Sequence, residues 1–335
     1  MQDFFSDKLA QAIHTQSPFV LYRKPNEEIV HLIVNDDSDE NIFLIHAFDN
    51  ETEKSISDKY PAQISQNEFE FDFNFNLELS PDFQPISEKN YTQLIQKTIH
   101  EIQNSETEKI VISRIKSIEN QSINLLKSFK NLTQTHPNAL VYFWQNPGNE
   151  TWLAATPELL LSKNQNQIKT VSLAGTKRPE IDWTPKEFEE QKIVTDYIVA
   201  HFSELKNLEL QGPETIQAGK FQHLKTYISG EIPNGFSMEN LLEKLHPTPA
   251  VCGLPKEKSF EFILKNEGYD RDFYAGYVGI ESENSQEYFV NLRCAQIFQD
   301  KIWIYVGGGI TSESVPQNEW NETELKSGTI MNSLA

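Results

Sequence analysis

The sequence contains few cysteines, few basic residues and no long apolar run. Its two cysteines, Cys252 and Cys294, are too few for a disulfide framework or a four-thiolate zinc site. Lysine and arginine number 29 against 49 acidic residues, the net charge is −20, and no basic patch is present. A chain of this charge repels phosphate backbones and anionic lipid, which argues against nucleic acid and membrane surfaces as partners.

The sequence also lacks the features of a membrane-spanning helix and of a signal peptide. No apolar stretch approaches the roughly 18 residues that a membrane helix needs. The N-terminus reads MQDFFSDKLAQAIHTQ, with acidic and polar residues where a signal peptide has a basic start and an apolar run. The sequence therefore predicts a cytoplasmic protein with reduced thiols.

Hydrophobic and aromatic residues make up 38% and 11% of the 335 residues, too much for a disordered protein. Periodicity predicts helices at the N-terminus, over 91–102, from Thr184-Pro185 onward and from about Pro316 to Met331. Strands are expected over 28–34, 41–48, 109–115, 140–144, 152–155, 275–282, 287–298 and 301–306. A hairpin is expected around Pro147-Gly148, and the glycines 307–309 are expected to end the last strand. No repeat is present, and the order of these elements predicts a strand-rich α+β fold in one compact body.

Two features divide the N-terminal part from the rest. Residues 69–79 read FEFDFNFNLEL, and this strict alternation predicts a half-buried edge strand or loop arm rather than an aromatic binding stripe. Pro81 and Pro85 follow, so a seam between subdomains is expected near 81–87.

Acidic residues on two helices are the candidates for a metal site. Glu190 lies four residues before Val194, so its carboxylate is expected on the buried face of its helix. Glu319, Glu322 and Lys326 share one face of the last helix. A solvated helix start and a surface ion-pair ladder are the alternatives. Together the two helices would offer the oxygen-only coordination that Mg²⁺ prefers.

An anion pocket is the second candidate site. The run Gly307-Gly308-Gly309 fits neither nucleotide-binding loop pattern, but its backbone N–H groups would let a carboxylate approach. Arg293, in the preceding strand, is a candidate bidentate partner for that carboxylate. Lys109 is a buried base if it points inward with its neighbours and an ordinary edge lysine if it points outward. His223 and His246 are more often core or turn histidines than catalytic ones.

The assembled motifs resemble the chorismate-utilising enzymes, and the matching segments follow the order of that family. They are EKIVISR (108–114), ATPELLL (155–161), SLAGTKRP (172–179), KEFEEQKIV (186–194), FQHLKTYISG (221–230), HPTPAVCGLP (246–255), YDRDFYAGYVG (269–279), VNLRCAQIF (290–298), YVGGGI (305–310) and EWNETELK (319–326). The resemblance implies one α+β domain over 1–335, built of two large, mostly antiparallel sheets packed face to face with helices outside. Its chorismate-binding core would cover 84–335, and residues 1–83 match weakly.

Two positions indicate which reaction the resemblance implies. Lys109 stands where isochorismate and salicylate synthases have a water-activating lysine and where anthranilate synthases typically have glutamine. Ala174 stands where aminodeoxychorismate synthases carry a lysine. Both features favour hydroxyl transfer over amination. The implied activity is isochorismate synthase, a hydroxymutase-type isomerase feeding menaquinone or siderophore biosynthesis. Salicylate synthase is the closest alternative, followed by an aminating synthase and an inactive chorismate-binding regulator.

The resemblance also implies a role for each matching residue. Glu190 and Glu322, with Glu319 nearby, would hold Mg²⁺, while Lys109 would deprotonate water and Glu158 would protonate the departing hydroxyl. The implied substrate-binding residues are Arg293, Tyr274, Gly307, Gly308, Gly309, Lys326, His223, Leu173, Gly175, Thr176 and Thr248. The family's usual His-Glu-His around the metal ligand reads Glu189-Glu190-Gln191 here. The central glutamate is kept, but the resemblance does not indicate which residues support it. Chorismate is the expected partner, without a glutaminase subunit, and the chain is expected to be a monomer.

Overall fold

The computed structural model describes residues 2–218 and 221–335, and these divide into two compact units. Unit 1 comprises Met1–Glu158, Pro247–Gly279 and Phe289–Ala335. Unit 2 comprises Leu159–His246 and Ile280–Tyr288. The seam expected near residues 81–87 therefore falls inside unit 1. The assignment of 1–335 to one domain, with a core over 84–335, stays a prediction.

Helices of both units are of ordinary length. They are α1 (Gln2–Thr15), α2 (Glu88–Asn104), α3 (Leu125–Thr135), α4 (Pro185–His201), α5 (Met238–Leu245), α6 (Lys256–Asn266) and α7 (Pro316–Met331), with a short 3-10 turn at Gln66–Glu68. No helix within residues 2–218 and 221–335 is long and apolar enough to cross a membrane.

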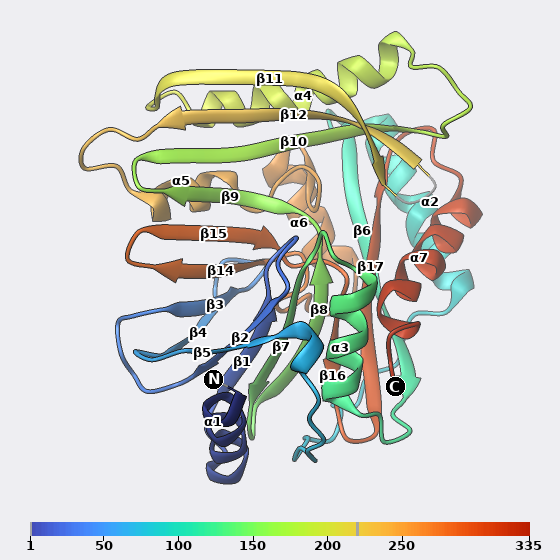
Figure 1. The fold of residues 1–335 in the computed structure, drawn as a ribbon. Helices are drawn as coiled ribbons and strands as arrows, with labels where there is room; N and C mark the ends of the chain where they lie inside the picture. Colours follow the sequence, from blue (N-terminus) through green and yellow to red (C-terminus); the bar gives the residue numbers. More distant parts are fainter. Residues whose placement is uncertain (1, 219–220) are drawn as a thin grey trace. The chain divides into compact units, whose positions relative to one another are not determined.

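A nine-stranded sheet lies wholly in unit 1. Its strands, in spatial order, are β13 (Gly253–Leu254), β6 (Lys109–Glu119), β17 (Lys301–Ile310), β16 (Cys294–Ile297), β8 (Glu150–Thr156), β7 (Leu140–Asn146), β1 (Phe19–Arg23), β2 (Ile29–Val34) and β5 (Ala62–Ser65). Helix α2 packs against β6, and α7 packs against β17 and α2 (Figure 1).

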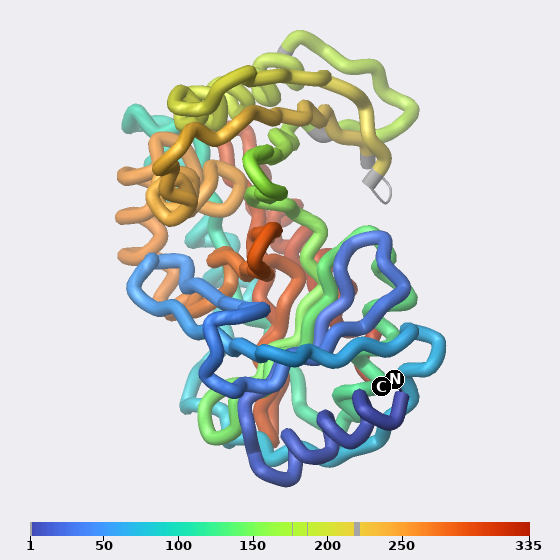
Figure 2. The backbone as a smooth tube through the Cα atoms, turned by 60° about the vertical axis from the view of Figure 1, so that its left-hand side comes forward, coloured from blue at the N-terminus to red at the C-terminus, as the bar shows by residue number. Residues whose placement is uncertain are grey.

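The second sheet has eight strands in the part of the chain that the structure describes. Their spatial order is β11 (Lys206–Ala218), β12 (Phe221–Glu231), β10 (Gln167–Lys177), β9 (Leu159–Asn164), β15 (Ser285–Val290), β14 (Tyr277–Ser282), β3 (Ile42–His46) and β4 (Glu53–Ser57). Within unit 2, α4 packs against β10 and β12, beside the long β11–β12 hairpin (Figure 2). Both sheets are built of antiparallel pairs, for example β6 with β17 and β10 with β12. The prediction of an α+β fold with two large, mostly antiparallel sheets is confirmed.

Local signals predicted the ends of several elements. Helix α2 begins after Ser87, whose side chain accepts a hydrogen bond from the Asn90 amide. Helix α4 begins at Pro185 after the capping-box residue Thr184, and α7 runs from Pro316 to Met331 as expected. The hairpin expected around Pro147-Gly148 is formed by β7 and β8. Helix caps and turns depend on a few neighbouring residues, so their positions can be predicted from the sequence.

The alternating segment 69–79 is extended but belongs to neither sheet. Phe69 is buried, and Phe71, Phe73, Phe75 and Leu77 pack partly buried against the main core cluster. The intervening polar residues are exposed. The prediction of a half-buried arm is confirmed, since a period of two needs one buried face and does not need a strand partner.

Two strand predictions were wrong in their bounds. The stretch 287–298 is interrupted at 291–293, and β15 and β16 on either side belong to different sheets. The glycine run lies inside β17 instead of ending it, because Gly307, Gly308 and Gly309 pair with Ser113, Ile112 and Val111 of β6. Pairing with a distant strand outweighs the weak intrinsic strand preference of glycine here.

The prediction that Glu190 extends the buried face of its helix was also wrong. Glu190 is exposed on α4, and the buried positions are Gln191, Thr195, Ile198 and Phe202 beyond the helix end. Val194 and Tyr197 are only half-buried. The buried stripe of α4 therefore begins one residue later than the apolar pattern suggested, because polar Gln191 and Thr195 form part of it.

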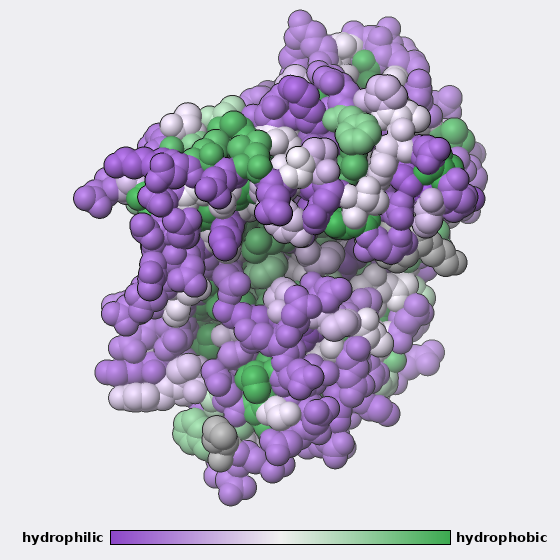
Figure 3. Space-filling view, turned by 45° about the horizontal axis from the view of Figure 1, so that its top comes forward, coloured by the Kyte–Doolittle hydropathy of each residue, from purple (hydrophilic) through white to green (hydrophobic). Residues whose placement is uncertain are grey.

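The face of the molecule shown in Figure 3 is mostly hydrophilic, with apolar side chains in small groups. This agrees with the high content of acidic and polar residues.

Asp272 links pH to the stability of unit 1. Burial, followed by the nearby carboxylates of Asp270 and Glu150, raises the pKa of Asp272 to about 7, against the opposing charge of Lys54. A carboxyl whose pKa is raised on folding stabilises the fold only while protonated, so that contribution is lost as the pH rises through about 7.

Replacing Asp272 with Asn is expected to remove this pH dependence. The variant should gain about 1–4 kcal/mol of unfolding free energy over the parent at pH 8 but little at pH 4. Asparagine also tolerates the positive φ of 51° at this position. Thermal melts at both pH values measure the difference, with exposed Asp39→Asn as the control. Equal shifts at both pH values would contradict the prediction.

Candidate functional site

The glycine run of β17 makes room for two side chains of unit 1. A Cβ added at Gly309 would lie 2.5 Å from Cε of Lys109, and one added at Gly307 would lie 2.9 Å from the hydroxyl oxygen of Tyr274. Neither position tolerates a side chain without displacing its neighbour. The glycines thus let Lys109 and Tyr274 lie directly on the surface of the strand.

The placement of Lys109 follows from this contact. Gly309 is paired with Val111 of β6, and Lys109 precedes Val111 by two residues, so the three positions share one face of the sheet. Lys109 therefore points inward with Val111 and Ser113, which was one of the two alternatives open from sequence. Its side chain is half-buried.

The backbone of Lys109 is held from two sides. Its carbonyl accepts a hydrogen bond of 3.1 Å from the Ser259 hydroxyl, and Leu254 of β13 pairs with it. A Cβ at Gly253 would lie 2.2 Å from the same carbonyl oxygen, and Gly253 has a φ of 138°. The HPTPAVCGLP segment is therefore needed to anchor the start of β6. Thr248 begins that turn, its carbonyl accepting from the Val251 and Cys252 amides.

Glu158 lies between β8 and β9, where its carbonyl accepts from the Val290 amide at 3.0 Å. Burial raises the pKa of Glu158 above its ordinary value, although the positive charges of Lys109, Arg293 and Lys326 each act to lower it. A carboxyl group with a raised pKa near three cations is suited to donate a proton to an anionic ligand.

Arg293 and Lys326 form the cationic side of the site. Arg293 lies in the link before β16 with a φ of 49°, and its Nη1 donates to the Lys326 carbonyl at 3.3 Å. Lys326 Nζ donates to the Gly307 carbonyl at 2.8 Å and pairs with Glu322 Oε1 at 2.6 Å. Burial lowers the pKa of Arg293, opposed by Tyr274, Glu322 and Glu158.

The backbone at Gly307 adds a donor on the same side. The N–H and C=O of a strand residue point to the same edge, so the Gly307 amide faces the edge at which Lys326 binds its carbonyl. On this edge, β16 pairs with β17 at Ile302–Ile304. At Gly307, this edge of β17 therefore offers a backbone amide beside the ammonium of Lys326, and both can donate to an anion.

Glu319 and Glu322 of α7 point toward Gly308. A Cβ at Gly308 would lie 3.3 Å from Glu319 Oε2 and 3.7 Å from Glu322 Oε1. Burial, with the charge of Glu322, raises the pKa of Glu319 above its ordinary value. Two carboxylates over a position without a side chain are hard oxygen donors that fit Mg²⁺.

Sequence reasoning missed the residues that hold α7 in place. Arg114 of β6 is almost fully buried, lies 3.8 Å from the centre of the Trp320 ring and donates from Nε to Thr323 Oγ1 at 2.9 Å. It also pairs with Glu324. Because Trp320, Thr323 and Glu324 are on α7, Arg114 sets the rotation of the helix that carries Glu319 and Glu322. The arginine was visible in EKIVISR, but only pairing could show its partner.

In unit 2, Gln191 joins α4 to the sheet. Its Nε2 donates to Ser172 Oγ and Thr226 Oγ1, both at 2.9 Å, and Thr195 Oγ1 donates to its carbonyl groups. This buried, satisfied network lies at the position where the resemblance implies a second histidine. The neighbouring Glu190 is exposed and stays a predicted metal ligand.

The other predicted residues of unit 2 lie on β10 and β12. Gly175 has a φ of 69° at an irregularity between Ala174 and Thr176, and its carbonyl is 3.2 Å from His223 Nδ1. Leu173 is 38% exposed, so it is available to a ligand. The side chain of Thr176 lies outside the described residues.

Unit 1 thus brings together most of the predicted site. Its members are Lys109, Glu158, Tyr274, Arg293, Gly307, Gly308, Gly309, Glu319, Glu322 and Lys326. Among residues 2–218 and 221–335, no group of three or more His, Cys, Asp or Glu side chains is close enough to hold a metal ion. The three-glutamate metal site therefore stays a prediction.

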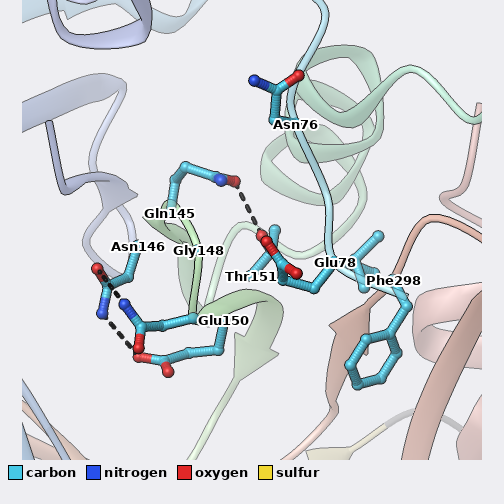
Figure 4. A pocket seen from close by; sticks show the side chains of 10 residues that line it. Asn76, Glu78, Gln145, Asn146, Gly148, Glu150, Thr151 and Phe298 are labelled. Carbon is cyan, nitrogen blue, oxygen red and sulfur yellow. Dashed lines mark hydrogen bonds between the residues drawn. The ribbon is translucent and has the colours of Figure 1, made fainter. Parts of the chain in front are cut away.

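Two cavities elsewhere in unit 1 do not suit an anionic ligand. The one at the β7–β8 turn measures about 10 Å³, and Figure 4 shows the Gln145–Thr151 and Asn146–Glu150 hydrogen bonds of its lining. That volume holds about one water molecule. The other, of about 460 Å³ beside residues 80–85, is lined by three acidic residues, Asp82, Glu119 and Asp300, and by one basic residue, Lys301, so its net negative charge repels anions.

Known proteins share both sequence and fold with this chain. The family described as "Chorismate binding enzyme" matches residues 23–335. The chain belongs to the chorismate binding enzyme family. The vibriobactin-specific isochorismate synthase of Vibrio cholerae is 28% identical over 263 residues, covering 73% of this chain and 66% of that enzyme. Across the first three curated relatives the aligned part spans 61% to 69% of their length.

Two solved structures share the fold of this chain. The menaquinone-specific isochorismate synthase MenF from Escherichia coli matches with a TM-score of 0.82 and 21% identity, over 95% of this chain and 89% of that one. Anthranilate synthase component I from Streptococcus pneumoniae matches with a TM-score of 0.70 and 19% identity, over 94% and 92%. The fold of this family member is thus shown, and the reaction must be argued from its site residues.

Proposed function

We propose that this chain is an isochorismate synthase that isomerises chorismate to isochorismate with Mg²⁺. The observation that carries the proposal is the position of Lys109 on Gly309, in the unit that also holds Glu158 with its raised pKa. A lysine and a protonated carboxyl are the base and the acid that the exchange of a hydroxyl group requires. The names of the V. cholerae and E. coli relatives support the same reaction.

The proposed reaction needs one proton taken and one returned. Lys109 Nζ, in its neutral form, accepts a proton from water as that water attacks C2 of the ring. Glu158 donates its proton to the C4 hydroxyl, which leaves as water while the double bonds shift. Water is added and water is lost, so the product is an isomer of the substrate.

The remaining residues bind and orient the substrate in this proposal. Arg293, Tyr274 and the Gly307 amide would hold the enolpyruvyl carboxylate, because each of them offers an N–H or O–H donor. Mg²⁺, when bound by Glu190, Glu322 and Glu319, would supply positive charge at the ring carboxylate. Leu173 and Gly175 would line the ring, with His223 and Lys326 at the pocket margin.

Proton donation by Glu158 predicts the pH dependence of turnover. The protonated form is the active one, so kcat is expected to fall as the pH rises through the raised pKa of Glu158. Glu158→Gln should lower kcat by about 10²- to 10⁴-fold. The remaining kcat should no longer fall as the pH rises. Exposed Glu283→Gln is the control and should behave like the parent. If the pH dependence of kcat were unchanged in Glu158→Gln, another group would be the proton donor.

Product analysis decides between this proposal and its closest alternatives. Incubation with chorismate and Mg²⁺ should give isochorismate as the main product by chromatography. Salicylate as the main product would establish pyruvate elimination, and anthranilate formation with ammonium would establish amination. No turnover, with chorismate bound, would indicate a regulator.

We further propose that the protein is a cytoplasmic monomer without a glutaminase subunit, and that it acts in a menaquinone or siderophore pathway.

A further inference from the structure

Arg293 lies in a three-residue link that joins the two sheets of the fold. Residues 291–293 connect β15 of the eight-stranded sheet to β16 of the nine-stranded sheet. Arg293 adopts a φ of 49°, and Ala275 in the loop before β14 adopts a φ of 61°. Such left-handed conformations are unfavourable for residues with side chains and persist only where surrounding contacts enforce them.

Asn291 lies two residues before Arg293 and bonds directly to Ala275. It is 0% exposed, and all four of its polar groups are bonded. Its amide donates to the Gly276 carbonyl at 2.8 Å, and its carbonyl accepts from the Ala275 amide at 2.9 Å. Its Nδ2 donates to the Phe273 carbonyl at 2.9 Å, and its Oδ1 accepts from the Tyr142 hydroxyl at 2.8 Å.

Three of these four bonds go to the loop that carries Tyr274. Phe273, Ala275 and Gly276 flank Tyr274 on both sides, so Asn291 ties the link of Arg293 to the loop of Tyr274. Tyr274 is itself buried and stacked on Tyr305, with ring centres 5.5 Å apart. The fourth bond joins the link to β7, a central strand of the nine-stranded sheet.

We infer that Asn291 is a positioning residue that sets the guanidinium of Arg293 and the hydroxyl of Tyr274 at a fixed separation for one carboxylate of the substrate. The inference rests on the proposed function, in which these two side chains bind the enolpyruvyl carboxylate. Two donors that must meet the two oxygens of one carboxylate depend on their mutual geometry, because the bond lengths tolerate errors of only a few tenths of an ångström.

The test separates substrate binding from chemistry. Asn291→Ala is expected to raise the KM for chorismate about tenfold with kcat within about twofold, because these contacts act equally in the ground and transition states. Tyr142→Phe removes only the hydroxyl and should raise KM about threefold, in a protein whose fold is otherwise intact. The double variant should be no worse than Asn291→Ala alone, since both changes break one connection.

Thr151→Val is the matched control. It removes a buried hydroxyl that donates to Gln145 at 3.0 Å on the same pair of strands, β7 and β8, at the β7–β8 turn (Figure 4). It should lower the melting temperature without raising KM. The rise in melting temperature that chorismate causes in each variant gives a second readout, and it should shrink for Asn291→Ala and Tyr142→Phe only.

Three outcomes would overturn the inference. Folded Asn291→Ala and Tyr142→Phe proteins with the parent KM and the parent shift with chorismate would show that Asn291 does not position the binding groups. An equal rise of KM in Thr151→Val would show general loosening. A parent chain that neither binds nor converts chorismate would end the proposed function, and this inference with it, whereas an active parent with unaffected variants would end the inference alone.

Discussion

Replacing Lys109 with Gln is expected to lower kcat by about 10²- to 10⁴-fold while leaving chorismate binding largely intact. The substitution removes the only proposed base, whereas the groups assigned to the carboxylates, Arg293, Tyr274 and the Gly307 amide, are untouched. The base role requires the neutral amine, so kcat is expected to rise with pH on the acidic side of the profile. Steady-state kinetics with chorismate over a pH series measure both effects.

The contact with Gly309 offers an independent check on the same residue. Gly309→Ala places a Cβ 2.5 Å from Lys109 Cε and must displace the lysine side chain. Its loss of kcat should resemble that of Lys109→Gln, and the double variant should be little worse than either one. Lys97→Gln, on the exposed face of α2, is the control. Near-parent kcat in Lys109→Gln would make the lysine structural, with His223 the next candidate for the base.

Glu190→Gln and Glu322→Gln are each expected to abolish turnover and to weaken Mg²⁺ binding. Each change removes one negative charge from the predicted ligands of a hard cation, and a lost carboxylate is not replaced by a neutral amide of similar size. Titration calorimetry with Mg²⁺ measures binding without depending on activity. Adding EDTA to the parent should stop turnover, and restoring Mg²⁺ should recover it.

The chain offers a matched control for this prediction. Glu189 precedes Glu190 on α4 and is equally exposed, so Glu189→Gln should retain both metal binding and activity. Full activity of the parent in EDTA would end the metal assignment. Loss of Mg²⁺ binding in Glu322→Gln with retention in Glu190→Gln would restrict the site to α7, where Glu319 and Glu322 both lie over Gly308.

Elements whose ends depend on nearby residues were predicted well. Helices α4 and α7 begin at Pro185 and Pro316, and the β7–β8 hairpin turns at Pro147-Gly148. Elements that depend on distant partners were not. The pairing of β16 with β8 and the continuation of β17 through its glycines depend on segments more than 100 residues away, such as Ala154 opposite Cys294 and Val111 opposite Gly309. Periodicity contains no information on such partners.

The same difference between local and distant determinants applies to the candidate site. The order of the motifs was sufficient to place the chain in its family and to name Lys109, Glu158, Arg293 and the acidic residues of α7 as candidates, because residue types at fixed positions are a property of sequence. Only the tertiary structure decided that Lys109 faces inward on Gly309, that burial raises the pKa of Glu158, and that Glu190 is exposed beside a buried Gln191. Orientation and desolvation arise from packing between segments remote in the chain, and no local pattern encodes them.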